Sequence, residues 1–210
     1  KFMEIKMFSD TICGWCYIGK ERLKQALREV GGNGIKVTNL PFQLNPDMPM
    51  EGMDRIQYIK KKFGSIENAK PMYDNMILQG QQENLEIKLD KIKKTPNTVK
   101  SHLLIDYAKL NKVENEVMDS IFESYFLKAK DIGDENVLLE IGKKHDLDIK
   151  GLEKFITQKE NLQKIDKLDT IAKQMGISGV PFYIFNDKIS ISGAETVENL
   201  AQAINKSLNG

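Results

Sequence analysis

The chain has 210 residues, of which 40% are hydrophobic and 29% charged, with 31 basic and 30 acidic side chains and a formal net charge of +1. This length suffices for one domain carrying an insertion, and the composition is that of a folded globular protein rather than a disordered one. No stretch approaches the ~18 uninterrupted apolar residues of a spanning helix, and no basic stripe interleaves with aromatic side chains, so we expect neither a membrane nor a nucleic acid as partner.

The first segment, Lys1 to Phe8, alternates apolar and charged residues and predicts a half-buried strand. It lacks the apolar block and the small-residue cleavage site of a secretion signal, so we expect a cytoplasmic protein. The chain begins at Lys1 without an initiator Met, which leaves a leader removed before Lys1 open.

A cysteine pair follows this strand. Ser9-Asp10-Thr11 has the side chains of a tight turn, and Cys13-Gly14-Trp15-Cys16 comes next. Apolar residues then recur at helical spacing until Gly31 to Gly34 stops the helix. Ile35 to Leu40 alternates again and predicts a second strand, running toward Leu44. The cysteine pair therefore lies in a strand-helix-strand unit, the context in which a Cys-x-x-Cys motif indicates redox chemistry.

From residue 46 to residue 175 nearly every stretch has helical period, and the amphipathic faces must pack against one another. We predict an inserted helical subdomain over 46–175, with helices at Met53 to Phe63, Ala69 to Asn84, Thr98 to Leu110, Glu114 to Lys128, Glu135 to His145, Lys150 to Ile156 and Glu160 to Met175.

The last segment returns to strands. Gly176 to Pro181 breaks the helical run, and two strands, Phe182 to Phe185 and Lys188 to Ser192, follow around an Asn186-Asp187 turn. Thr196 is a predicted N-cap for a final helix that ends at Leu208. Residues 1–45 and 176–210 therefore form one predicted α/β domain, interrupted by the helical insertion.

The chemistry is expected at the two cysteines. A thiolate is the nucleophile of disulfide exchange, and the N-terminus of a helix stabilises that anion. We expect Cys13, at the exposed first position, to attack the substrate, and Cys16, one turn further and more buried, to resolve the mixed disulfide. Trp15 would then form part of the contact surface.

Three other uses of the cysteines fit the sequence less well. Zinc needs four ligands, and the two histidines, His102 and His145, are distant in sequence and on predicted helices, so we expect no metal. A structural disulfide across so short a loop removes little chain entropy. Two ordinary buried thiols would not explain a position between a strand and a helix.

Val180-Pro181 is the second candidate element. Proline cannot donate to a strand ladder, and X-Pro bonds tolerate cis geometry. The residues alone leave two options open: a trans proline that starts the strand, or a cis turn that presents the backbone of Val180 to an extended substrate.

Three further features have structural and functional interpretations. We favour a turn role for Asp10 over proton acceptance through water. We favour a surface or interhelical role for His102 over one at the dithiol. The methionines of the loop from Met48 to Met53 could line an apolar groove for substrates.

The segment Phe8 to Lys20 resembles the active-site segment of the FrnE-like branch of the DsbA family, which is related to 2-hydroxychromene-2-carboxylate isomerases and kappa-class glutathione transferases. Nearly the whole chain shares the likeness, through Asn97-Thr98 with His102, Tyr125-Phe126 with Asp131 to Asp134, Gly176 to Phe182, and Ser192 to Ala194.

The resemblance implies an α/β, thioredoxin-like fold with a large all-helical insertion and protein disulfide oxidoreductase activity. It also implies a nucleophilic Cys13, a resolving Cys16 and a cis Pro181 beside the dithiol. Members of this branch often carry proline where Gly14 stands. Glycine relaxes the backbone at the helix start, and the redox potential depends on how well the thiolate is stabilised there.

The same relatives supply the main alternative. The isomerases and transferases use a serine near the position of Cys13 and bind glutathione, so glutathione-dependent isomerase or transferase chemistry stays open. A non-catalytic redox sensor or client-binding protein is the alternative from another class. For the favoured reading we expect protein thiols and disulfides as substrates, no cofactor, and glutathione only as a redox partner; the sequence does not give the direction of exchange.

Overall fold

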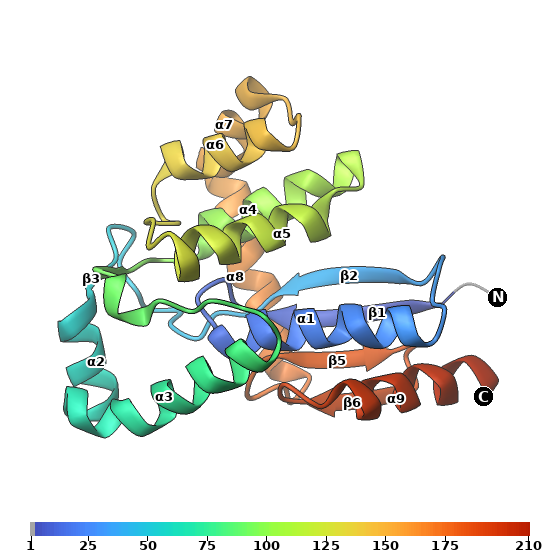
Figure 1. Cartoon of the computed structure of the whole chain (residues 1–210). Helices are drawn as coiled ribbons and strands as arrows, with labels where there is room; N and C mark the ends of the chain where they lie inside the picture. Colours follow the sequence, from blue (N-terminus) through green and yellow to red (C-terminus); the bar gives the residue numbers. More distant parts are fainter. Residues whose placement is uncertain (1–2) are drawn as a thin grey trace. The chain divides into compact units, whose positions relative to one another are not determined.

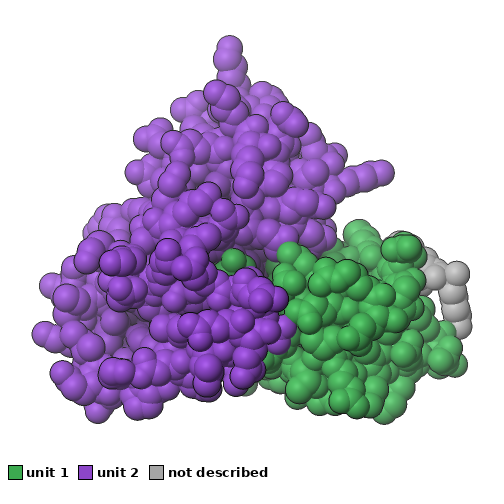
Figure 2. Space-filling model, viewed as in Figure 1, with its two compact units in different colours: residues 1–44, 168–210 green, residues 45–167 purple. Residues whose placement is uncertain are grey.

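The computed structural model describes residues 3–210, so Lys1 and Phe2 of the first predicted strand lie outside the described residues. The chain divides into two compact units, which Figure 2 colours separately: unit 1 comprises residues 1–44 and 168–210, and unit 2 comprises residues 45–167. The sequence predicted domain boundaries after residues 45 and 175, whereas this division falls after residues 44 and 167. The predicted domain boundaries stay a prediction.

Unit 1 contains a mixed four-stranded sheet with strand order β2-β1-β5-β6. Strand β1, Glu4–Ser9, pairs in parallel with β2, Lys36–Pro41, and antiparallel with β5, Phe182–Phe185. Strand β6, Ile189–Ser192, completes the sheet beside β5. The turn between these last two strands places Asn186 and Asp187 at φ of 52° and 55°, which confirms the predicted hairpin turn.

Two helices cover one face of this sheet (Figure 1). Helix α1, Gly14–Glu29, packs against α9, Val197–Asn209, and both bury apolar side chains on the sheet. The predicted stop of α1 is confirmed, since the chain turns at Gly31 with φ of +64°, where glycine avoids the strain of a side chain. The shared core has the alternation expected of strands, with these members: Ile5, Met7, Leu23, Ala26, Tyr183, Phe185, Leu200, Ala203 and Ile204.

The opposite face of the sheet has its own smaller core. Phe8 and Phe42 pack there with Ala172 of helix α8, Lys159–Gln174, and with Ile177. Phe8 and Phe182 meet edge to face with ring centroids 6.2 Å apart. Because successive strand residues point to opposite faces, Phe182 and Tyr183 serve different cores.

Unit 2 is mainly helical, and its elements follow the predicted order. In chain order they are β3 Met53–Asp54, α2 Arg55–Phe63, α3 Ile66–Gln82, a 3₁₀ turn at Leu89–Lys91, β4 Lys94–Thr95, α4 Val99–Ala108, a 3₁₀ turn at Lys109–Asn111, α5 Glu114–Phe122, a π-helical turn at Glu123–Leu127, α6 Glu135–Lys144, α7 Ile149–Thr157 and the first part of α8.

Three sequence predictions need correction here. The insertion is not wholly helical, because β3 and β4 pair antiparallel through Met53 and Thr95. The helix predicted from Ala69 begins earlier, since the Ser65 side chain accepts from the N–H of Asn68 and caps it. The helix predicted over Glu114 to Lys128 changes to a wider turn after Phe122, which the periodicity of apolar residues does not reveal.

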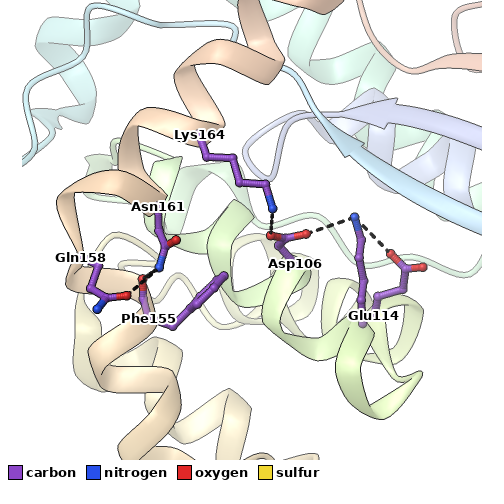
Figure 3. A network of polar contacts seen from close by, with 7 residues as sticks. Asp106, Glu114, Phe155, Gln158, Asn161 and Lys164 are labelled. Atoms are coloured by element: carbon purple, nitrogen blue, oxygen red, sulfur yellow. Dashed lines mark hydrogen bonds and ion pairs between the residues drawn. The ribbon is translucent and has the colours of Figure 1, made fainter.

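Buried apolar side chains hold the helices of unit 2 together. This core includes Leu103, Leu104, Val117, Ile121, Phe122, Phe126, Leu138, Leu152, Ile156 and Ile165. At its edge Lys164 of α8 forms an ion pair with Asp106 of α4 at 2.9 Å, and Asn161 donates to the carbonyl oxygen of Phe155 at 2.9 Å (Figure 3). Within residues 3–210 the structure holds no helix that meets the length and hydropathy of a membrane span.

Candidate active site

The first turn of α1 is built around the sulfur of Cys13. Cys13 has extended backbone angles, with φ −90° and ψ 109°, and is the N-cap of the helix. Its Sγ accepts the backbone N–H of Cys16 at an N–S distance of 3.2 Å. The first turn carries no acidic side chain to offset the partial positive charge of the helix end. The local geometry therefore directs a backbone N–H and the positive end of a helix at the Cys13 sulfur.

Cys13 is less exposed than we expected. Its side chain and backbone together are only 6% exposed, because the sulfur lies between the first turn of α1 and the loop before β5. The Sγ–H donates to the carbonyl oxygen of Val180 at 3.7 Å. Cys16 is fully buried, so the predicted order of exposure holds although both thiols are largely covered.

Both cysteines are free thiols. Burial is the main cause that raises the pKa of Cys16 well above its ordinary value, and the hydrogen bond and charge of Cys13 add to it. Cys16 therefore keeps its proton near neutral pH. A thiol that stays protonated while its neighbour reacts suits sequential attack and resolution.

The Val180–Pro181 peptide bond is cis, as the resemblance implied. Pro181 is buried and its carbonyl oxygen accepts the N–H of Gly193 at 2.8 Å, while Val180 is half-buried. Gly14 is the first, buried residue of α1, and Trp15 beside it is half-buried. The structure thus brings Val180 to Cys13, and the binding roles of Trp15, Val180 and Pro181 stay predictions.

Asp10 fixes the loop that carries the motif. Its buried carboxylate accepts the N–H groups of Thr11 and Leu44, each at 2.8 Å, and its carbonyl oxygen accepts the N–H of Cys13 at 3.1 Å. These bonds give Asp10 the turn role favoured from the sequence. They also join β1, the motif and the end of β2 in one rigid arrangement.

Tyr183 is a residue of this site that the sequence analysis missed. It is fully buried, and among residues 3–210 nothing hydrogen-bonds to its hydroxyl. Burial, followed by the charges of Cys16 and Cys13, raises its pKa well above the ordinary value. The alternation of β5 places Tyr183 on the α1 face, which is the signal that was available, but nothing in the sequence pairs it with the dithiol.

The residues considered for other sites lie in unit 2. His102 is buried, and the Nε2 of His145 lies 2.7 Å from the hydroxyl oxygen of Ser120. Within residues 3–210 no three His, Cys, Asp or Glu side chains gather as a metal site requires. Met48 is buried and Met50 exposed, so Met48 does not contribute to an open groove on that loop.

A protein-family model described as a DSBA-like thioredoxin domain matches residues 4–205. Among solved structures, the probable DsbA oxidoreductase SCO1869 from Streptomyces coelicolor superposes with a TM-score of 0.87 at 24% identity, covering 99% of this chain and 90% of that one. The α/β thioredoxin-like fold predicted from the sequence is thereby confirmed.

Two further structures share the fold at lower identity. A 2-hydroxychromene-2-carboxylate isomerase has a TM-score of 0.74 at 12% identity, covering 98% of this chain and 96% of that one. The cytosolic disulfide reductase DsbM from Pseudomonas aeruginosa, solved with GSH, has a TM-score of 0.71 at 14% identity, covering 99% of this chain and 100% of that one. At such identities these neighbours establish the fold and leave the reaction open.

Proposed function

The chain belongs to the DsbA-like thioredoxin-domain family, and from that premise we propose that it is a thiol–disulfide oxidoreductase that exchanges disulfides with protein substrates through Cys13 and Cys16. The observation that carries the proposal is the position of the Cys13 sulfur. It caps α1 and accepts the N–H of Cys16, while the thiol of Cys16 is buried one turn deeper.

Reduction of a substrate begins at Cys13. Once its thiol has lost the proton, the Cys13 sulfur attacks one sulfur of the substrate disulfide, and a mixed disulfide forms as the substrate S–S bond breaks. The other substrate sulfur leaves with the electron pair and takes up a proton. The N–H of Cys16 and the positive end of α1 stabilise the charge on Cys13 before the attack.

Cys16 completes the exchange. Its thiol loses a proton and its sulfur attacks the Cys13 sulfur, so that a Cys13–Cys16 disulfide forms and the second substrate sulfur leaves as a thiolate. The protein is oxidised by two electrons and the substrate is reduced by two. The same steps in reverse oxidise a substrate dithiol, and the reduction potential of the pair against its surroundings sets the direction.

We assign substrate contact to the groups around the Cys13 sulfur. The carbonyl oxygen of Val180 lies 3.7 Å from that sulfur and offers an acceptor for the backbone N–H of an extended peptide. Pro181 holds this carbonyl at the site, and Trp15 supplies a half-buried aromatic side chain next to the motif.

The proposed partners are protein thiols and disulfides, with glutathione as a redox partner and no bound cofactor. DsbM, a cytosolic disulfide reductase of the same fold that was solved with GSH, supports both a role for glutathione and a cytoplasmic location for this chain.

Trapping a mixed disulfide tests the proposal. In a Cys16→Ser variant the Cys13 sulfur still attacks but is not released, so the variant should accumulate a covalent adduct with a disulfide-bonded protein such as insulin. The matched Cys13→Ser variant should form none, and only the unmodified chain should reduce insulin catalytically. Adducts formed equally by both variants, or by neither, would overturn the proposal.

A second candidate is a glutathione-dependent isomerase or transferase, which the fold shared with a 2-hydroxychromene-2-carboxylate isomerase favours. Conjugation or isomerisation that survives in Cys13→Ser, combined with no insulin reduction by the unmodified chain, would favour this candidate. Loss of every activity in Cys13→Ser favours disulfide exchange.

A further inference from the structure

A buried tyrosine hydroxyl lies against the helix that carries the dithiol. Tyr183 is fully buried, and its hydroxyl makes no hydrogen bond with any group in residues 3–210. Buried polar groups are nearly always hydrogen-bonded in folded proteins, so an unpaired hydroxyl calls for an explanation. Tyr183 is therefore a residue whose role goes beyond filling the core between β5 and α1.

Gly19 allows the hydroxyl to reach this position. A Cβ atom at Gly19 would overlap the Tyr183 hydroxyl oxygen and lie 2.9 Å from Cγ of Pro181. The hydroxyl thus fits against α1 and the ring of the cis proline. A residue other than glycine at position 19 would place its Cβ atom where the hydroxyl lies. Phenylalanine at position 183 would fill nearly the same volume, so volume alone does not account for tyrosine.

The position relates Tyr183 to both cysteines. Gly19 follows Cys16 by three residues, a spacing that places both on one side of a helix. Pro181 follows Val180, whose carbonyl oxygen accepts a hydrogen bond from the thiol of Cys13. Charge on either sulfur raises the pKa of Tyr183, which agrees with this placement. Arg22 lowers and Glu195 raises the same pKa. Asp10 acts on the pKa of Cys16, which its backbone hydrogen bond lowers and its charge raises.

Tyr183 acts as a donor and not as a base. Since burial and the sulfur charges raise its pKa well above the ordinary value, the hydroxyl keeps its proton whenever a thiolate forms nearby. In the dithiol state no group of residues 3–210 accepts a hydrogen bond from that hydroxyl. An interaction that forms only as charge develops lowers the barrier of that step without stabilising the starting state.

We propose that Tyr183 positions and stabilises the resolving sulfur, its hydroxyl donating to Cys16 as that thiol loses its proton and attacks Cys13. This deepens the proposed function and rests on it. In the step the Cys16 proton passes to solvent, the Cys16–Cys13 bond forms, and the bond between Cys13 and the substrate sulfur breaks. The substrate sulfur leaves with the electron pair and is protonated from solvent. Tyr183 retains its own proton throughout.

Ellman's reagent separates the two steps in one experiment. Attack by Cys13 releases a first thionitrobenzoate at a rate proportional to reagent concentration, and resolution by Cys16 releases a second at a rate independent of it. In Tyr183→Phe we expect the first phase unchanged and the second about tenfold slower near neutral pH, the loss expected for one hydrogen bond to a charged group. The pH profile of the second phase should also move to higher pH.

Two matched variants complete the test. Tyr125→Phe removes another buried tyrosine hydroxyl, in unit 2, and should leave both phases unchanged. Gly19→Ala retains the tyrosine but moves its hydroxyl away from its position against α1, so this variant should slow the second phase as well.

The outcomes separate the two proposals. A second phase of unchanged rate and pH profile in Tyr183→Phe, or equal slowing of both phases, would overturn the role of Tyr183 while leaving the dithiol chemistry standing. Absence of both phases in the unmodified chain would overturn the oxidoreductase proposal and this inference with it.

Discussion

The thiol of Cys13 donates to the carbonyl oxygen of Val180 at 3.7 Å, across 167 positions of the chain. In the function proposed above, this backbone group serves two purposes. In the dithiol it accepts a hydrogen bond from the Cys13 thiol, and that bond is lost when Cys13 becomes a thiolate or forms a mixed disulfide. We propose that the carbonyl oxygen then accepts an N–H of the bound peptide, so that attack and substrate binding are linked through a single oxygen.

The unequal burial of the two thiols predicts selective alkylation. Near neutral pH, iodoacetamide should modify Cys13 and leave Cys16 untouched, because Cys16 is fully buried and its pKa is raised by that burial. Peptide mapping by mass spectrometry measures the modified position. The unfolded chain should take up two groups, and modification of Cys16 before Cys13 in the folded chain would contradict the assignment.

The close approach at Gly19 predicts a cost for Gly19→Ala. The added methyl group would overlap the Tyr183 hydroxyl, and neither that ring nor the ring of Pro181 can give way easily. We expect the free energy of unfolding to fall by about 1–3 kcal/mol, as for overpacking in a core. Urea titration measures it.

Gly179→Ala is the control for this substitution. Apart from Gly179 and its two chain neighbours, no atom of residues 3–210 lies within 4 Å of a Cβ atom built at Gly179, and the φ of Gly179 is outside the left-handed region. The free energy of unfolding of the Gly179→Ala variant should stay unchanged or rise slightly, because alanine lowers the conformational entropy of the unfolded chain. Equal losses in the two variants would mean that the contact at Gly19 is not their cause.

The sequence predicted the parts of the fold that depend on local periodicity. Alternation identified Ile35 to Leu40 as a strand, and the break at Gly176 to Pro181 marked Phe182 to Phe185 as another. The glycines after Val30 marked the end of α1. Cys13 was expected at the start of a helix because a strand and a turn precede it. These signals lie within a few residues of the structure that they specify.

Contacts between distant segments could not be predicted in this way. Nothing in the sequence indicates that β5 brings the Tyr183 hydroxyl to Gly19. Nor does it indicate that the Val180 carbonyl covers the thiol of Cys13, a residue that is 6% exposed. The π-helical turn after Phe122 could not be predicted either, because the helix ends within that turn and no later helical residue shows a shifted apolar pattern.

Removing a buried carboxylate of unit 1 should lower the free energy of unfolding more than removing an exposed one. Asp169 is 4% exposed and accepts the N–H of Gln43 and the Nζ of Lys173, each at 2.7 Å. Asp169→Ala leaves a buried N–H without its acceptor, so we expect a loss of about 1–3 kcal/mol. The midpoint and slope of urea unfolding give the value.

Asp187→Ala provides the comparison. Asp187 also pairs with a lysine, Lys6, at 2.7 Å, but its side chain is 74% exposed. Exposed ion pairs contribute little, so stability should change by less than about 1 kcal/mol. A loss as large as that of Asp169→Ala would show that burial is not the deciding factor.

The thiol of Cys16 predicts how stability depends on pH. Burial raises its pKa well above the ordinary value of 9.0, so the folded chain keeps a proton that the unfolded chain loses as pH rises through that value. The unfolded state then binds fewer protons, and stability must fall with rising pH, by at most about 1.4 kcal/mol per pH unit for one group. Below the ordinary value this contribution is fully present.

Guanidinium midpoints of the reduced protein from about pH 7 to about pH 9.5 should show the decline before tyrosines ionise near pH 10. Cys16→Ala, which retains Cys13, should show a shallower decline, and parallel curves for the two proteins would refute the assignment.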